Sequence, residues 1–187
     1  MVTFGVVAAV TTIFIMSIKI RTLAQSRKIE YMSQTDLLTG LKNRNYYEKQ
    51  LHKYPRMCKS NLICVYGDVN GLHEVNNRQG HFAGDRMLCD VAAVMQAHFG
   101  SEHTYRIGGD EFIALRMDAQ PETALAELEW MRQELAGKGY YVSFGMAARE
   151  KEQGSFGMQE LVKEAESSMF SAKNEFYRQP EHNRRNR

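Results

Sequence analysis

The sequence predicts a protein of the α/β or α+β class, with helices packed on a sheet that contains one β-hairpin. Short apolar runs alternate along the chain with stretches of helical period, and this alternation favours layers of helix on sheet. Between residues 104 and 117, two β-prone runs flank Gly108-Gly109, a pattern typical of a hairpin whose turn has positive φ. With 187 residues, of which 43% are apolar, the chain is long enough for one domain plus additional segments.

The N-terminal residues 1–20 are expected to form a membrane helix. Residues 2–18 carry no charge, although the run is slightly shorter than the roughly 20 residues that a span needs. A buried core helix is the alternative. The basic residues that follow, Lys19, Arg21, Arg27 and Lys28, would place the rest of the chain in the cytoplasm. Residues 21–34 are expected to be a polar helical linker, and residues 179–187 a basic tail.

The first half of the domain, from residue 35, is predicted as helix, strand and helix. Asn43 is expected to cap a helix over residues 44–53, and Asp36 to form a structural ion pair with Arg44. Residues 61–66 read as a central strand that ends at Asp68, with a short helix following through Asn77. A carboxylate at a strand end, followed by free helix N–H groups, suits a metal-bound triphosphate.

The second half of the domain is predicted from the spacing of apolar residues that is typical of helices and of strands. Helices are expected over residues 85–99, 121–136 and 161–178, the two hairpin arms over residues 104–106 and 111–117, and a further strand over residues 140–148. The missing side chains at Gly108 and Gly109 would let a ligand lie against bare backbone.

Composition excludes some classes of function. A net charge of +2 gives no reason to expect a nucleic-acid polymer as partner. The three cysteines, Cys58, Cys64 and Cys89, show no metal-ligand spacing, and Cys64 and Cys89 lie in apolar runs. Cys64 and Cys89 are interpreted as reduced core residues of a cytosolic domain.

Five ordered blocks carry a resemblance to a known family. Residues 106–112 read RIGGDEF, residues 36–44 read DLLTGLKNR, and three further blocks lie at residues 68–85, 143–145 and 165–173. Over about residues 35–178 the chain resembles the GGDEF family, the diguanylate cyclases. The resemblance implies a ferredoxin-like palm, similar to those of nucleotide cyclases and polymerases, with helices on both faces of the sheet.

The resemblance also implies an activity. Two GTP molecules would condense to cyclic di-GMP with release of pyrophosphate, assisted by two Mg²⁺ or Mn²⁺ ions per active site. One domain holds one GTP, so a C₂ homodimer is required. With the membrane helix, the expected location is the bacterial inner membrane, single-pass, with the domain in the cytoplasm. The alternative is an inactive domain that binds GTP and signals by dimerising.

The site residues follow from matched positions. Asp110 is expected to bind metal and accept a proton, Glu111 to have a secondary metal role, and Asn76 with Asp85 to read the guanine edge. The catalytic set is Asp110, Glu111 and His73, and the metal contacts are Asp68, Val69, Asp110 and Glu111. The substrate contacts are Gly71, Leu72, Asn76, Asp85, Gly108, Gly109, Lys173 and Arg178.

The chain departs from the family pattern at three places. His73 stands where a lysine is frequent, and Tyr177, with Arg178 one residue later, stands where an arginine commonly follows the last-helix lysine by four. Each change removes a positive charge from the triphosphate region. An inhibitory product site is also not expected, because its Arg-x-x-Asp positions are Phe99 and Glu102, interpreted as a core residue and a solvated loop residue.

Overall fold

The computed structural model describes residues 2–151, 157–180 and 182, and it describes side chains from residue 12 onward. The elements, in chain order, are α1 (Val2–Gln34), β1 (Lys42–Asn43), α2 (Arg44–Leu51), α3 (Tyr54–Met57), β2 (Asn61–Asn70), α4 (Leu72–Gln79), α5 (His81–Phe99), β3 (Thr104–Arg106), β4 (Glu111–Met117), α6 (Pro121–Gly137), β5 (Tyr141–Glu150) and α7 (Met158–Arg178). The predicted basic residues of the tail, Arg184, Arg185 and Arg187, lie outside the described residues.

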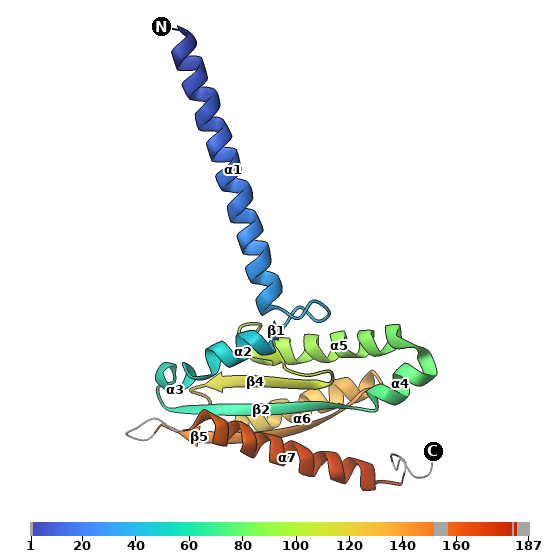
Figure 1. The fold of residues 1–187 in the computed structure, drawn as a ribbon. Helices are drawn as coiled ribbons and strands as arrows, with labels where there is room; N and C mark the ends of the chain where they lie inside the picture. The colour runs from blue at the N-terminus through green and yellow to red at the C-terminus, as the bar shows by residue number, and fades with distance from the viewer. Residues whose placement is uncertain (1, 152–156, 181, 183–187) are drawn as a thin grey trace.

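The sheet is mixed, and β2 lies inside it between β4 and the edge strand β5 (Figure 1). Its strand order is β1-β3-β4-β2-β5; β1 runs parallel to β3, and the other neighbours are antiparallel. Strand β2 pairs with β4 through Asp68 opposite Glu111, and with β5 through Asp68 opposite Ser143. The predicted hairpin is therefore present as β3 and β4, and it places the signature turn beside β2.

Helices cover both faces of the sheet, as predicted. Because successive residues of a strand point to opposite faces, Ile63 and Val65 of β2 join the core under α5 and α6. Cys64 and Tyr66 join the second core, under α2, α3 and α7. The expected strand at 61–66 continues to Asn70, so Asp68 lies inside a strand rather than at its end.

Helix α7 approaches β5 closely, and a glycine makes this possible. A Cβ added at Gly145 would lie 2.7 Å from the Cα of Met169, and closer still to the Met169 nitrogen and the Ala165 carbonyl oxygen. Since those atoms belong to the helix backbone, no side-chain rotation could make room for it. The contact fixes α7 on the sheet and thereby places its later residues, Lys173 among them.

Helix α1 projects away from the sheet (Figure 1). The expected membrane helix and linker are one continuous helix, and its described part exposes apolar side chains such as Ile13, Phe14 and Leu23. Within the residues that were described, however, no helix is both long and apolar enough to cross a membrane, so the predicted membrane helix is not supported. The single-pass location, which depended on it, stays a prediction.

Candidate active site

The centre of the candidate site is a buried carboxylate paired with a lysine from the last helix. Lys173 Nζ lies 2.6 Å from Asp68 Oδ1, and Asp68 is only 6% exposed. Burial raises the pKa of Asp68, the hydrogen bond and charge of Lys173 lower it, and the nearby carboxylates of Asp110 and Glu111 raise it further. The structure thus brings together residues 68 and 173, which the sequence analysis had assigned to one site.

The signature turn lies directly beside this pair. Val69 donates its N–H to the carbonyl of Asp110 at 3.0 Å, and Glu111 stands opposite Asp68 in the register of β2 and β4. Asp68 and Glu111 are therefore neighbours across the two strands, and Asp110 precedes Glu111 at the end of the turn. Among the described residues, no group of three or more His, Cys, Asp or Glu side chains is arranged to hold a metal ion.

The donor atoms nevertheless suit a hard cation. Asp68, Asp110 and the backbone carbonyl of Val69 offer oxygen ligands, which Mg²⁺ and Mn²⁺ prefer. Because the buried Asp68 carboxylate is repelled by two others, a divalent cation would relieve that repulsion. These residues fit the expected metal in their chemistry.

The two glycines of the turn differ from each other in role, and neither supplies the left-handed backbone that was expected. Neither Gly108 nor Gly109 has positive φ, so the prediction of a turn that needs left-handed backbone was wrong. A Cβ on Gly108 would lie 3.2 Å from the Cβ of Glu111 and closer still to its carboxylate, whereas a Cβ on Gly109 would meet nothing within 4 Å. Gly108 thus makes room for Glu111, and Gly109 leaves the backbone bare on its open side.

The predicted guanine-reading residues lie at the junction of α4 and α5. Asn76 Oδ1 is buried and has no hydrogen-bond partner among the described residues, which leaves an acceptor for a ligand. A Cβ on Gly84 would lie 2.9 Å from the Asn76 Cγ, so this glycine lets the amide lie against α5. Asp85, the next residue, is exposed and lies just after the first turn of α5. The two predicted residues are thus brought to one place.

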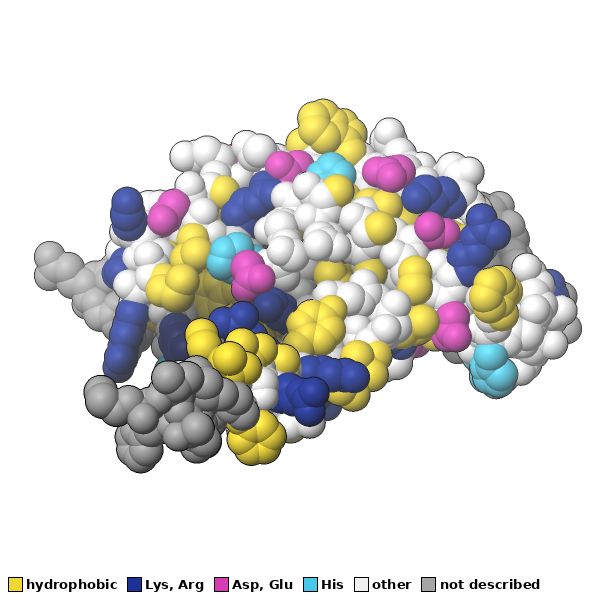
Figure 2. All heavy atoms as spheres, turned by 90° about the horizontal axis from the view of Figure 1, so that it is seen from above, with side chains coloured by type: hydrophobic (Ala, Val, Ile, Leu, Met, Phe, Trp, Pro, Cys, Tyr) yellow, Lys and Arg dark blue, Asp and Glu magenta, His cyan; other side chains and the backbone are white. Residues whose placement is uncertain are grey.

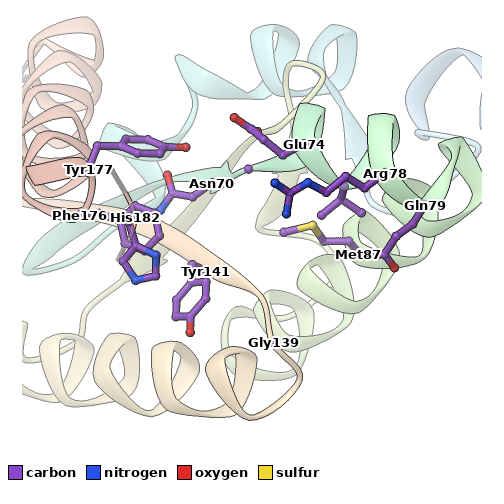
Figure 3. Close-up of a pocket in the computed structure, with 12 residues that line it drawn as sticks. Asn70, Glu74, Arg78, Gln79, Met87, Gly139, Tyr141, Phe176, Tyr177 and His182 are labelled. Atoms are coloured by element: carbon purple, nitrogen blue, oxygen red, sulfur yellow. The ribbon is translucent and has the colours of Figure 1, made fainter. Parts of the chain in front are cut away.

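A cavity of about 680 Å³ opens beside the end of β2 (Figure 3). Gly71, which precedes the first turn of α4, lines it, together with Asn70 of β2. Arg78 extends into it from α4, and Tyr177 faces it from α7. The sequence analysis missed Arg78, although its spacing of four from Glu74 along α4 was a signal that both share one helix face.

Two predicted residues, His73 and Arg178, lie differently from what their roles require. His73 is exposed, with its ring nitrogen 3.2 Å from the amide of Asn77. Arg178 is exposed and lies 4.0 Å from Glu175, so the structure gives no support to its predicted phosphate contact. Leu72, by contrast, begins α4 as expected, where its N–H faces no helical partner.

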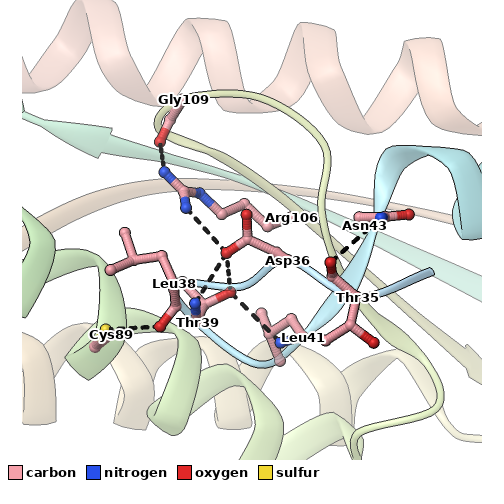
Figure 4. Close-up of polar contacts among 9 residues, drawn as sticks. All are labelled: Thr35, Asp36, Leu38, Thr39, Leu41, Asn43, Cys89, Arg106 and Gly109. Atoms are coloured by element: carbon pink, nitrogen blue, oxygen red, sulfur yellow. Dashed lines mark hydrogen bonds and ion pairs between the residues drawn. The ribbon is translucent and has the colours of Figure 1, made fainter. Parts of the chain in front are cut away.

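The loop that follows α1 is tied to the signature turn through an ion pair for which the sequence analysis predicted the wrong partner (Figure 4). Asp36 pairs with Arg106 at 3.0 Å, and Arg106 donates to the Gly109 carbonyl at 2.8 Å. Arg44 pairs instead with Glu48, one turn along α2. Burial alone would raise the pKa of Asp36, but hydrogen bonds from Thr39 and the Arg106 guanidinium outweigh it and lower that pKa.

Phe99 and Glu102, at the two positions of the inhibitory product site, make contacts within this chain. Phe99 is 6% exposed within the core under α5, and the guanidinium of Arg116 lies 4.7 Å from the centre of its ring. Glu102 is largely exposed and pairs with Lys42 at 3.3 Å. Phe99 is therefore a core residue, as predicted.

Figure 2 shows positive and negative side chains interspersed over the face seen from above.

A family model and several known proteins match this sequence. The sequence model described as "GGDEF: Diguanylate cyclase, GGDEF domain" matches residues 33–179. The chain is 32% identical over 169 residues to the cyclic di-GMP phosphodiesterase PdeB of Shewanella oneidensis, covering 82% of this chain and 19% of that protein. It is 30% identical over 115 residues to a diguanylate cyclase of Vibrio cholerae, covering 59% of this chain and 36% of that protein.

A solved structure shares the fold. The coiled coil and GGDEF domain of DgcB from Caulobacter crescentus, in complex with c-di-GMP, superimposes with a TM-score of 0.76 at 19% identity. The match covers 85% of this chain and 91% of that one. Since the family model spans most of the chain, this protein belongs to the diguanylate cyclase GGDEF-domain family.

Proposed function

We propose that this chain is an active diguanylate cyclase, which joins two GTP molecules into cyclic di-GMP and releases pyrophosphate. The observation that carries the proposal is the Asp68–Lys173 pair, which lies opposite Glu111 and beside the Asp110 turn. The buried carboxylate of Asp68 is paired with the ammonium group of Lys173, beside an open turn that contains two glycines. This arrangement is suited to phosphoryl transfer. The relatives that are named as diguanylate cyclases support this class of reaction.

Some residues of the site would orient the substrate, and others would stabilise its charge or accept a proton. Asn76 and Asp85 would hold the guanine, because the unpaired amide oxygen of Asn76 needs a donor and a carboxylate accepts from N1–H and the 2-amino group. Lys173 and the first N–H groups of α4 would hold the triphosphate. Asp110 would accept the proton of the attacking 3′-hydroxyl. Bound through Asp68, Asp110 and the Val69 carbonyl, Mg²⁺ or Mn²⁺ would supply charge stabilisation at the transferred phosphoryl group.

The reaction requires two copies of the chain. Because each domain has one set of guanine-reading residues, two GTP molecules meet only where two domains face each other. The exposed apolar side chains of α1, among them Ile13, Phe14, Met16 and Leu23, offer surface that a second α1 would cover. We therefore propose a homodimer.

The alternative function is an inactive domain that binds GTP and signals by dimerising. It is favoured by one observation: the charges lost at positions 73 and 177 are not restored, since His73 is exposed on α4 and Arg178 is exposed beside Glu175. Each loss would weaken transition-state stabilisation by a few kcal/mol at most, about the cost of removing one such donor.

A direct assay separates the two functions. The full chain is incubated with GTP and Mg²⁺ or Mn²⁺, and cyclic di-GMP and pyrophosphate are measured by chromatography and mass spectrometry, with Asp110→Asn as the catalytic control and ATP as the substrate control. Binding of a non-hydrolysable GTP analogue is measured in parallel by calorimetry. Product from GTP alone, lost in the variant, supports the cyclase. Analogue binding without product identifies the inactive domain, and no analogue binding contradicts both.

A further inference from the structure

The side chain of Glu111 folds back beneath the signature turn instead of extending from it. Its Oε1 accepts a hydrogen bond from the hydroxyl of Tyr66 at 2.9 Å. Its other oxygen lies under Gly108, so close that a Cβ at that position would collide with it. Both carboxylate oxygens are therefore placed by neighbours within the fold.

The backbone of Glu111 holds the same turn. Its carbonyl accepts from the N–H of Ile107 at 3.0 Å and from the N–H of Gly108 at 3.4 Å. The residue thus closes the turn with its main chain and supports it with its side chain. Asp110 and Gly109, which face the substrate in the proposed function, stand on the segment that these contacts hold.

Tyr66 is well placed to anchor Glu111. It is 5% exposed and belongs to the core between the sheet and α7, so its ring has little freedom. It lies on the same strand and the same face as Asp68, two residues away. Asp68 is held by Lys173 and Glu111 by Tyr66. The two carboxylates that oppose each other in the sheet therefore have separate partners, which keeps them from competing for the one lysine.

We propose that Tyr66 is a positioning residue that fixes Glu111 beneath the turn, and that Glu111 in turn fixes the conformation of residues 107–110. The role of Glu111 is thereby support of the turn. The effect on catalysis rests on the proposed cyclase function, because it acts through Asp110. The effect on the turn does not depend on any activity.

The consequence of losing the hydroxyl follows from the hydrogen bond it makes. Loss of a hydrogen bond to a charged acceptor shifts an equilibrium by about tenfold or more. Tyr66→Phe keeps the ring in the core and removes only this bond. The turn should then open about ten times more often, and Asp110 should spend less time in its productive position.

The test uses hydrogen exchange together with a double-mutant cycle. Tyr66→Phe, Glu111→Ala and the double variant are compared with wild type, with Tyr46→Phe as the matched control. Tyr46 is partly buried, and its hydroxyl makes no hydrogen bond among the described contacts. Amide exchange is followed in peptides covering residues 106–112, and kcat and KM for GTP are measured in the cyclase assay.

The expected result is specific to the turn. Tyr66→Phe should speed exchange of the Ile107 and Gly108 amides about tenfold and lower kcat about tenfold, each a change equal to about 1.4 kcal/mol. KM should change less than about twofold, because the guanine contacts on α4 and α5 are untouched. Tyr46→Phe should change neither quantity. In the Glu111→Ala background, Tyr66→Phe should have no further effect.

Two results would overturn the inference. One is exchange at residues 106–112 that is the same in Tyr66→Phe as in wild type. The other is an effect of Tyr66→Phe that remains undiminished when Glu111 is already alanine. If wild type itself makes no cyclic di-GMP, the proposed function fails, whereas the exchange measurement still decides the role of Tyr66.

Discussion

Replacing Gly145 by alanine should displace helix α7 and loosen the pair at the centre of the site. The new Cβ would lie 2.7 Å from the Met169 Cα, whereas ordinary contact begins at 3.4 Å, so the helix must move by at least about 0.7 Å. Two backbone atoms, the Met169 nitrogen and the Ala165 oxygen, lie closer still, so neither can turn aside. Overpacking of this kind costs about 1–3 kcal/mol of unfolding free energy.

The displacement should reach Lys173. That residue is one helical turn beyond Met169, roughly 6 Å along the axis, and moves with the same rigid helix. An added separation of about 0.7 Å would lengthen the Nζ to Oδ1 distance from 2.6 Å to about 3.3 Å, just beyond the roughly 3.2 Å outer limit of a hydrogen bond. Because Asp68 is buried and its pKa is already raised, weakening this pair should lower GTP affinity about tenfold.

The assay pairs urea unfolding with calorimetric binding of a non-hydrolysable GTP analogue. Gly137→Ala is the matched control, because a Cβ at that position meets nothing within 4 Å; it should leave binding unchanged and stability equal or slightly higher. A Gly145→Ala protein with wild-type unfolding free energy and wild-type affinity would refute the packing argument.

Three further predictions follow. Gly109→Ala should leave unfolding free energy within about 0.5 kcal/mol, since nothing lies within 4 Å of its Cβ, but should weaken binding of the GTP analogue, and equal binding would contradict a ligand lying on this backbone. Because the pKa of Asp68 is raised above 3.8, its contribution to stability is complete below that value and is lost as pH rises through the folded pKa. In metal-free buffer, the unfolding free energy of wild type relative to Asp68→Asn should therefore fall over that pH range, and a constant difference in urea titrations would show the sign to be wrong. Cyclic di-GMP should not bind tightly at Phe99 and Glu102, because a core phenyl ring offers neither charge nor donor; calorimetric titration showing tight binding that survives Glu102→Ala would reveal a different inhibitory site.

Local patterns in the sequence were enough to predict most of the elements. The apolar run of β2, the hairpin arms and the amphipathic stripe of α5 depend on neighbours within a few residues, so their periods are visible directly. The capping role of Asn43 was also predicted, since its side chain accepts from the Tyr46 N–H three residues later. The five family blocks added the identity of the domain.

The tertiary structure decided which side chains meet. Asp36 pairs with Arg106 rather than with Arg44, and Tyr66 supports Glu111, although neither partner is close in sequence. Gly108 makes room for a side chain, a need that no local turn rule contains. Such partners depend on strand register and on how closely helices pack, which are set by the whole core. Sequence alone therefore determined the helices, the strands and the family. The tertiary structure determined how the carboxylates are held, because an ion pair or hydrogen bond forms between atoms that are near in space, whatever their separation along the chain.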